Sequence, residues 1–427
     1  MAQIKAKYDL AKTLLQGQPT GGAKWAQDAR AAAAARLRKM GAPHRRDEYW
    51  KYTNPTPLTA ETAAAAVFDD AEEAPPFVDV ERLKVVFVDG VYAPDLSSDL
   101  SRAGFAIEPL SSAMEKDIHW ASGLFGVLEA KGQDPVDRPL AALNTARAAE
   151  GFAIHVTGKA SLPVSFVYLH EDPNSNAMIH HVIKMDEGAE LTVLENGPVA
   201  ARSNVVMEVD IPDRARFHHI RAQGRDHERL VSTGIFARLG TESMFKSFTL
   251  SVNGRLTRNE CVLDITGDDT VAHVAGASAG DGDYHHDDTI FITHDAVNCE
   301  SRQVFKKVLR NGAIGVFQGK ILVQPDAQKT DGYQISQGLL LDENSTFQAK
   351  PELEIYADDV ACSHGSTVGA IDEESIFYLT SRGIPRREAQ DMLTLAFLGE
   401  AVDEIENDDL ADEIRDRLAG WLARRSG

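Results

Sequence analysis

The chain has 427 residues, a hydrophobic content of 43% and a formal net charge of −21, because 65 acidic residues outnumber 44 basic ones. That length predicts two or three structural units with ample apolar material for a core. The negative charge argues against a protein whose main role is to bind nucleic-acid phosphates or an anionic membrane surface, since long-range repulsion would oppose approach.

The cysteine content excludes a disulfide framework. Cys261, Cys299 and Cys362 lie far apart, without a CxxC motif, so this chain alone is not expected to hold an iron–sulfur cluster or a structural zinc. The N-terminus lacks a contiguous apolar signal region, and no run approaches the length of a membrane span. A cytoplasmic location is therefore the expectation.

Residues 1–130 are predicted to form a helix-rich N-terminal region. A helix is expected over residues 26–40, where apolar side chains recur at helical spacing, and it is expected to end at Gly41. An aromatic segment follows at residues 46–53. Residues 84–92 predict two strands joined by an Asp-Gly turn.

Residues 131–370 are predicted to form a β-rich core, because short β-type runs follow one another with turn residues such as Asn-Gly between them. This pattern indicates a sandwich, a barrel or a solenoid. The region is long for a single sandwich, so a β-helix is favoured, although no strict sequence repeat is present. The predicted strands are 152–156, 164–170, 178–185, 190–195, 204–211, 216–221, 230–239, 243–252, 258–265, 289–293 and 313–323.

Residues 371–427 are predicted to form a helical C-terminal region. Two apolar stripes indicate two helices: Ala389, Met392, Leu393, Ala396 and Phe397, then Leu410, Ile414, Leu418, Trp421 and Leu422. Between them, residues 400–413 contain eight acids and no basic residue. Such a run is either a solvated helix face, the commoner case, or a docking surface for a partner with a basic complement.

Nucleotide-binding and metal-binding motifs are mostly absent from the sequence. The nearest approach to a phosphate-binding loop, at residues 315–321, has the wrong spacing, so no nucleotide site is expected. The paired histidines at 180–181, 218–219 and 285–286 cannot place both rings on one ion in a strand, and we expect them to be structural or paired with acids. Residues 281–288 are either a cation site or a surface turn, and the turn is preferred.

Cys362 and His364 form a more specific pattern. They are two residues apart, so an extended chain would place a thiol and an imidazole on one face. A nearby imidazolium would lower the pKa of the thiol. The pair supplies half of a tetrahedral site, and the remaining ligands would come from elsewhere. The alternative is that Cys362 is simply a small core residue.

Several longer motifs follow one another along the chain. They are Tyr49-Trp-Lys-Tyr-Thr53, Cys299-Glu-Ser-Arg-Gln-Val-Phe305, Gly315-Val-Phe-Gln-Gly-Lys-Ile321, Ala327-Gln-Lys-Thr-Asp-Gly-Tyr-Gln334, and the stretch 351–384 around Cys362-Ser-His364-Gly365. This ordered series resembles the SufB/SufD family of iron–sulfur cluster assembly scaffolds. Within the family, the Cys-Ser-His-Gly sequence is more similar to the SufD branch than to SufB.

The resemblance implies a right-handed parallel β-helix flanked by helical regions, in a scaffold subunit that is not itself an enzyme. It implies pairing with SufB and binding of the ATPase SufC, which would hydrolyse the ATP, through residues 371–427. A transient iron–sulfur cluster would form at the SufB–SufD interface, with Cys362 and His364 as metal ligands from this chain.

Two other possibilities remain open at this point. One is a metal-dependent or carbohydrate-active enzyme on a β-helix or sandwich, motivated by the many histidines and aspartates of the β-rich region. The other is a homodimer formed through the last coil of the β-helix when the chain is alone, because an open sheet edge needs to be covered.

Overall fold

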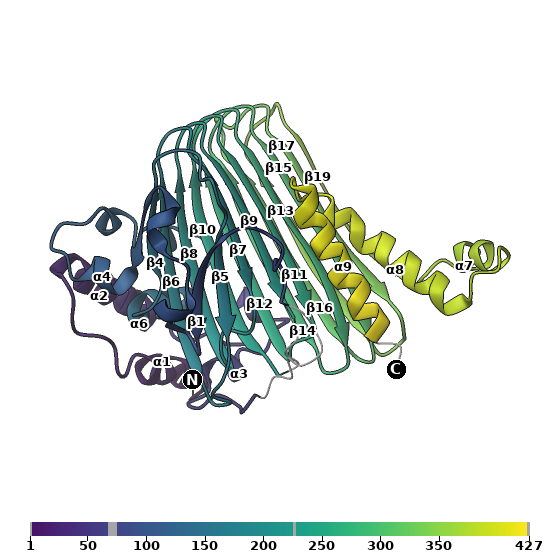
Figure 1. Cartoon of the computed structure of the whole chain (residues 1–427), viewed down its shortest axis with the longest axis horizontal. Helices are drawn as coiled ribbons and strands as arrows, with labels where there is room; N and C mark the ends of the chain where they lie inside the picture. The colour runs from purple at the N-terminus through teal and green to yellow at the C-terminus, as the bar shows by residue number, and fades with distance from the viewer. Residues whose placement is uncertain (1, 67–74, 225–227, 425–427) are drawn as a thin grey trace.

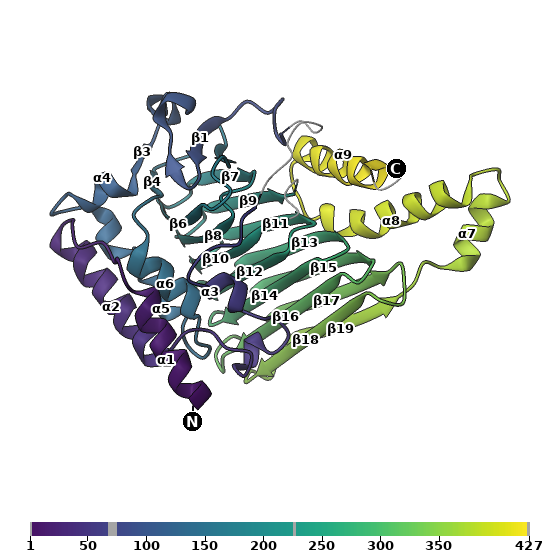
Figure 2. The same ribbon diagram turned by 90° about the horizontal axis from the view of Figure 1, so that it is seen from below.

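Two β-sheets lie face to face and run the length of the molecule (Figures 1 and 2). The computed structural model describes residues 2–66, 75–224 and 228–424. Sheet A contains β1 (Leu83–Val88), β2 (Val91–Tyr92), β5 (Val164–Leu169), β7 (Glu190–Asn196), β9 (Arg216–Gln223), β11 (Met244–Val252), β13 (Val271–Asp281), β15 (Glu300–Arg310), β17 (Asp331–Leu340) and β19 (Ala361–Gly369). Sheet B contains β3 (Ala106–Pro109), β4 (Phe152–Val156), β6 (Asn176–Met185), β8 (Arg202–Ile211), β10 (Leu230–Leu239), β12 (Leu256–Ile265), β14 (His285–His294), β16 (Ile314–Val323) and β18 (Thr346–Ile355).

From β4 onward the chain alternates between the sheets, and each strand pairs in parallel with the strand two places further along. This connectivity is that of a β-solenoid, which decides between the sandwich, barrel and solenoid interpretations and confirms the mainly β prediction. Asn-Gly pairs make the predicted turns: Asn253 and Gly254, like Asn311 and Gly312, have positive φ angles, which these residue types tolerate best.

Within residues 131–370, five strands lie outside the predicted runs: β13, β15, β17, β18 and β19. Their sequences are rich in alanine and glycine, in charged residues, or contain Pro351, and none has high intrinsic β propensity. Pairing with neighbouring coils imposes the strand conformation here, because each coil supplies a preformed row of backbone donors and acceptors to the next.

The main core lies between the sheets, where alternate residues of each strand face inward. Phe166, Ile183, Met207, Phe217 and Phe305 belong to this continuous apolar cluster and are almost completely buried. Burying a side chain of this size contributes roughly 1.5–3 kcal/mol each relative to exposure.

Helices cover the outer faces of both sheets (Figure 2). They are α1 (Ala2–Leu14), α2 (Lys24–Met40), α3 (Thr56–Thr59), α4 (Leu110–Met114), α5 (Leu128–Lys131), α6 (Pro139–Arg147), α7 (Glu373–Thr380), α8 (Arg386–Val402) and α9 (Asp408–Arg424). The helices before β4 pack against sheet B, and α8 and α9 pack against sheet A. None of these helices, within the ranges that the structure describes, is long and apolar enough to cross a membrane.

The C-terminal helices bury only part of the predicted apolar stripes. The stripe of α9 is confirmed, since all five of its residues are buried against sheet A. The predicted apolar stripe of α8 is wrong in part, because Met392 and Ala396 are exposed, whereas Leu398, which was not in the predicted stripe, is buried. The reason is that the first half of α8 projects away from the solenoid together with α7 (Figure 1), so only its second half reaches the sheet.

The acidic run at 400–413 does more than face solvent. Three of its carboxylates form ion pairs with basic side chains of sheet A: Glu400 with Lys306, Glu404 with His273 at 2.8 Å, and Glu406 with Lys246 at 2.8 Å. The run therefore holds the junction of α8 and α9 on the sheet, a role that the sequence alone did not indicate. The exposed Asp408 and Asp409 are the part of the run that fits the solvated-face prediction.

The two ends of the solenoid differ. At the N-terminal end, β2 pairs antiparallel with β1 and β3 pairs antiparallel with β4, so the first coil is covered. At the C-terminal end, β18 and β19 are the terminal strands of their sheets, and no strand of the described ranges pairs with their outer edges. The division of the chain into regions at residues 130 and 370 stays a prediction. Strands β1–β3, which precede residue 130, belong to the same two sheets as the later strands.

Candidate functional site

The uncovered last coil carries the predicted metal-binding pair. Cys362 and His364 both lie on β19, two residues apart, so their side chains share one face of the strand. In the parallel register they stand next to Gly332 and Gln334 of β17, and Gln334 is completely buried between the sheets. The pair therefore occupies the inward face of β19 at the open end of the solenoid.

The Cys362 thiol is half-buried, whereas His364 is exposed. Gly332 makes room for the sulfur, because a Cβ at that position would lie 3.1 Å from Cys362 Sγ. Burial raises the pKa of the Cys362 thiol, a hydrogen bond from the Gly332 backbone opposes this, and the nearby Asp331 carboxylate adds to it. The expectation that an imidazolium lowers this pKa is wrong here, because the pKa is raised and His364 is not among the groups that shift it.

The other two cysteines are buried, Cys261 on β12 and Cys299 in the turn just before β15. Burial raises the pKa of Cys261 to about 12, and it also raises the pKa of Cys299, whose thiol donates to the Gly267 carbonyl at 3.3 Å. Within the described ranges, no group of three or more His, Cys, Asp or Glu side chains is arranged to hold a metal ion. The metal-binding role of Cys362 and His364 therefore stays a prediction.

The paired histidines are mostly buried beside acids, as the sequence analysis expected. His219 Nε2 lies 3.0 Å from Glu195 Oε2, and His180 Nε2 lies 3.8 Å from Glu208 Oε1. The prediction of a surface turn at residues 281–288 is wrong for the second half of that segment. Strand β14 begins at His285, and Asp288 is buried between the sheets. The partners that make this burial tolerable come from other coils.

A polar network, which sequence reasoning missed, crosses the interior of the solenoid. It begins at Tyr168, whose hydroxyl donates to Glu195 at 2.9 Å, and Arg221 Nε donates to the same carboxylate at 2.5 Å. Arg221 also donates to Thr233 at 3.0 Å, and Thr233 donates to Asn259 Oδ1 at 2.8 Å. The signal in the sequence was a charged residue at an inward position of an otherwise apolar strand, which becomes visible only when the faces are assigned.

The network continues to a buried lysine. Asn259 Nδ2 lies 3.0 Å from His286 Nε2, and Lys307 Nζ donates to His286 Nδ1 at 2.7 Å and to Asp288 Oδ2 at 2.6 Å. Burial lowers the pKa of Lys307 and raises that of Asp288, and in each case the partner's charge opposes the shift. At Glu195, burial alone would raise the pKa, but Arg221 and the hydrogen bond from His219 outweigh it and lower the pKa.

The aromatic segment at 46–53 fixes the N-terminal region to the outer face of sheet B. The guanidinium of Arg258 lies 4.1 Å from the ring centroid of Trp50 and forms ion pairs with Glu260 and Asp287. Thr53 donates to Asp287 at 2.5 Å. These contacts give the segment a structural role on the side of the molecule opposite α9.

Comparison with known proteins supports the resemblance seen in the sequence. A family model described as "SUF system FeS cluster assembly, SufBD core domain" matches residues 168–397. The chain is 27% identical to the iron–sulfur cluster assembly protein SufD of Escherichia coli, covering 90% of each chain. It is 26% identical to the SufD protein of Bacillus subtilis, covering 83% of this chain and 84% of that one, and 27% identical to a SufBD family protein of Synechocystis, covering 88% and 86%.

The buried histidines predict a loss of stability in mild acid. Burial lowers the pKa of His180 to about 3 and those of His181, His218 and His294 to about 4. Because the unfolded chain takes up protons below about pH 6.5 while the folded chain does not, the free energy of unfolding should fall between about pH 6.5 and pH 4, by up to about 1.4 kcal/mol per pH unit for each histidine. Urea unfolding across this range measures the slope.

Two variants, one at His294 and one at its hydrogen-bond partner Ser301, test the cause of that slope. His294→Gln should reduce the slope of the free energy of unfolding against pH by the contribution of one histidine, since it removes one titrating group. Ser301→Ala, which removes the hydroxyl 2.9 Å from His294 Nε2, should lower stability at every pH while keeping the slope. A profile that is flat from pH 6.5 to 4 in the unmodified chain would contradict the buried neutral state.

Proposed function

The chain belongs to the SufBD family of the SUF iron–sulfur cluster assembly system, within which it is most like SufD, and we propose that it acts as a non-catalytic scaffold subunit of that system. In this proposal it pairs with SufB through the last coil and binds the ATPase SufC through the C-terminal helices. ATP hydrolysis belongs to SufC.

The observation that carries the proposal is the uncovered coil formed by β18 and β19. These strands of ten and nine residues leave backbone donors and acceptors free along both sheets. Large apolar side chains at this end are exposed, including Ile355, Tyr356 and Val368. Another solenoid of the same kind would extend both sheets and cover these side chains, and in the absence of SufB a second copy of this chain would do the same.

The cluster is the cargo of this interface. His364 offers a borderline nitrogen ligand and Cys362 a soft sulfur ligand once its proton is lost, and both types bind iron in iron–sulfur centres. Two donors do not complete the coordination of a cluster, so in this proposal the remaining ligands come from the partner. The raised pKa of Cys362 means that a base or the metal itself removes the thiol proton as the site assembles.

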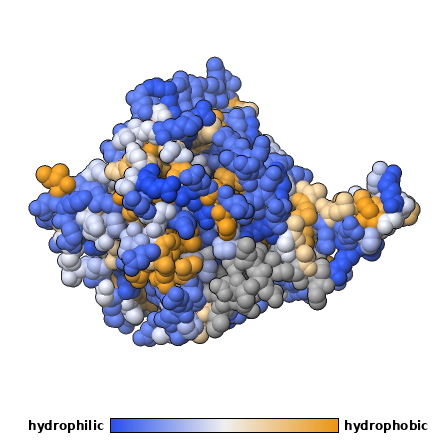
Figure 3. Space-filling view, in the orientation of Figure 1, coloured by the Kyte–Doolittle hydropathy of each residue, from blue (hydrophilic) through white to orange (hydrophobic). Residues whose placement is uncertain are grey.

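The projecting arm, consisting of α7 and the first half of α8, supports the binding of SufC. Phe377 is 74% exposed, Tyr378 57% and Met392 45%. Figure 3 shows hydrophobic residues along this arm, at the right of the molecule. Apolar side chains gathered on an extended helical arm are typical of a protein-binding surface.

Substitution of Val368 tests the pairing with SufB. Val368→Asp should abolish co-purification of co-expressed SufB, because it places a charge in the apolar part of the edge. Val91→Asp is the matched control: Val91 is 58% exposed and Val368 55%, but Val91 lies on β2 at the covered end. Equal retention of SufB by both variants would contradict pairing through β18 and β19.

A second substitution tests the binding of SufC. Phe377→Asp together with Met392→Asp should reduce SufC capture at least tenfold while SufB is retained, since the arm does not touch the last coil in this proposal. Point variants are preferable to deleting the C-terminal region, because deletion of α9 would expose the outer core of sheet A. Undiminished SufC capture by the double variant would exclude the arm as the docking surface.

The cluster site is tested separately from the complex. His364→Ala should lower iron and sulfide incorporation into the purified SufB–SufC complex of this chain by tenfold or more, with subunit stoichiometry unchanged, because an exposed ligand can be removed without loss of packing. Thr367→Ala, an exposed neighbour on β19, is the control. Iron content equal to that of the unmodified complex would rule out His364 as a ligand.

A further inference from the structure

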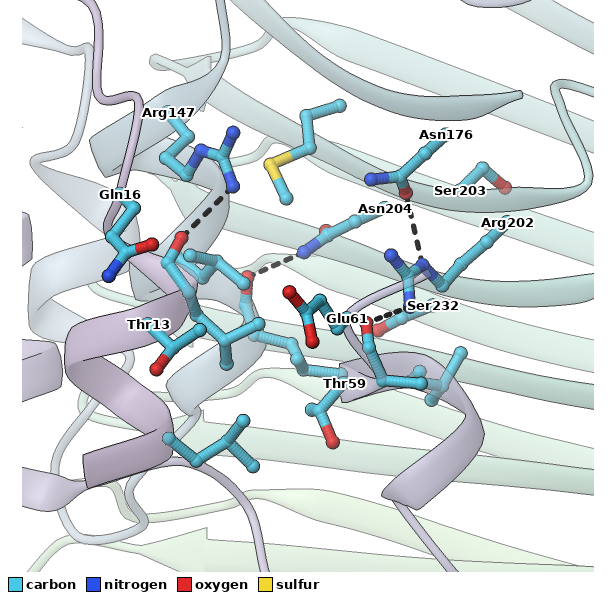
Figure 4. Close-up of a pocket in the computed structure, with 17 residues that line it drawn as sticks. Thr13, Gln16, Thr59, Glu61, Arg147, Asn176, Arg202, Ser203, Asn204 and Ser232 are labelled. Carbon is cyan, nitrogen blue, oxygen red and sulfur yellow. Dashed lines mark hydrogen bonds between the residues drawn. The ribbon is translucent and has the colours of Figure 1, made fainter. Parts of the chain in front are cut away.

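A cavity of about 530 Å³ lies between the N-terminal helices and the outer face of sheet B, far along the chain from the last coil. Helices α1, α3 and α6 form one side, and strands β6, β8 and β10 form the other (Figure 4). Its volume is in the range of small-molecule sites, roughly 300–1,000 Å³.

Two guanidinium groups face this cavity without a carboxylate partner. Arg202, 7% exposed, donates from Nε to Asn176 Oδ1 at 3.1 Å and from Nη1 to the Ala60 carbonyl at 2.6 Å. Arg147 donates from Nη1 to the Leu14 carbonyl at 3.0 Å. These bonds go to neutral acceptors, and among the described residues no ion pair joins either guanidinium to a carboxylate. In a chain with a net charge of −21, two arginines without an acidic partner at one cavity are unusual.

The electrostatic state of the cavity favours a bound anion. Burial lowers the pKa of Arg202, and the positive charge of Arg147 lowers it further, so the two cations are close enough to repel one another. Glu61 is the one acid among the lining residues, and in Figure 4 its carboxylate lies near the centre of the cavity, below Arg147 and to the left of Arg202. Its side chain is exposed and can swing out to solvent.

The rest of the lining mixes apolar side chains with amide and hydroxyl groups. The apolar side chains are five leucines from the helices and Met178 from β6: Leu10, Leu14, Leu58, Leu140, Leu143 and Met178. Amide and hydroxyl groups lie beside Arg202, including Asn176, Ser203 and Ser232. A ligand that uses both the two arginines and the leucines has an oxyanion at one end and an apolar group at the other.

We propose that this cavity binds a small amphipathic anion, a carboxylate or a phosphate ester, with its oxyanion between Arg147 and Arg202 and its apolar part against the leucines of α1 and α6. Arginine suits this role because its planar fork matches both kinds of oxyanion. Glu61 competes for the same place and sets the affinity. The inference does not depend on the role in cluster assembly, since no residue of the last coil contributes to the cavity.

Isothermal titration calorimetry of the full chain tests this with four probes: hexanoate, hexyl phosphate, inorganic phosphate and 1-hexanol. Either hexanoate or hexyl phosphate should bind at least tenfold more tightly than inorganic phosphate, and 1-hexanol should bind no better than inorganic phosphate. The relative affinity of the two hexyl anions tells which oxyanion the cavity prefers. No binding of either hexyl anion, or equal binding of inorganic phosphate, would overturn the proposal.

Substitutions locate the binding. Arg147→Gln should weaken the preferred anion about tenfold or more, as expected for the loss of a charge-assisted hydrogen bond. Glu61→Gln should strengthen binding several-fold, an effect that a general loss of structure cannot produce. Arg216→Gln, an exposed arginine on sheet A, is the control and should change nothing. Unchanged affinity in both Arg147→Gln and Glu61→Gln would overturn the assignment to this cavity.

Discussion

Each coil of the solenoid can satisfy its backbone N–H and C=O groups only by pairing with the coil before it and the coil after it. The N-terminal region meets this requirement with short antiparallel strands, β2 and β3, and with helices over sheet B. The C-terminal helices do not, because α8 and α9 turn back over sheet A instead of covering β18 and β19. Within the described ranges, one end of the stack is thus covered, whereas the other keeps the uncovered strand edges beside which Cys362 and His364 lie.

The same parallel stacking explains how charged residues are tolerated inside the molecule. Inward positions of successive coils lie about 4.8 Å apart, so a carboxylate on one strand and a cation on a neighbouring strand meet without rearrangement. Glu195 meets Arg221 in this way, and Asp288 meets Lys307 across the interior. Such pairs are costly to desolvate and contribute little net stability, but removal of one partner costs about 3–5 kcal/mol because the other charge is left buried.

The sequence predicted the apolar strands well and the charged ones poorly. β4 and β10 match their predicted limits at both ends, since local apolar and β-branched residues determine them. β15 was missed because its lysines acquire partners only in the fold: Lys307 bonds a residue 19 positions away, and Lys306 bonds Glu400, 94 positions away. The shared face of Cys362 and His364 followed from their spacing. Their place on the last, open coil did not, because it depends on the path of the whole chain after β19.

The buried ion pairs also make each coil different from its neighbours, because each pair joins particular residues of particular strands. The sheets offer nearly the same row of backbone groups at every level, so hydrogen bonding alone would allow a coil to dock one level too early or too late during folding. With such a slip, Arg221 would no longer stand beside Glu195, and Lys307 would be separated from both His286 and Asp288. The absence of a strict repeat in the sequence is therefore useful to the chain: its uneven interior permits one order of assembly, and a stack of identical coils would permit many.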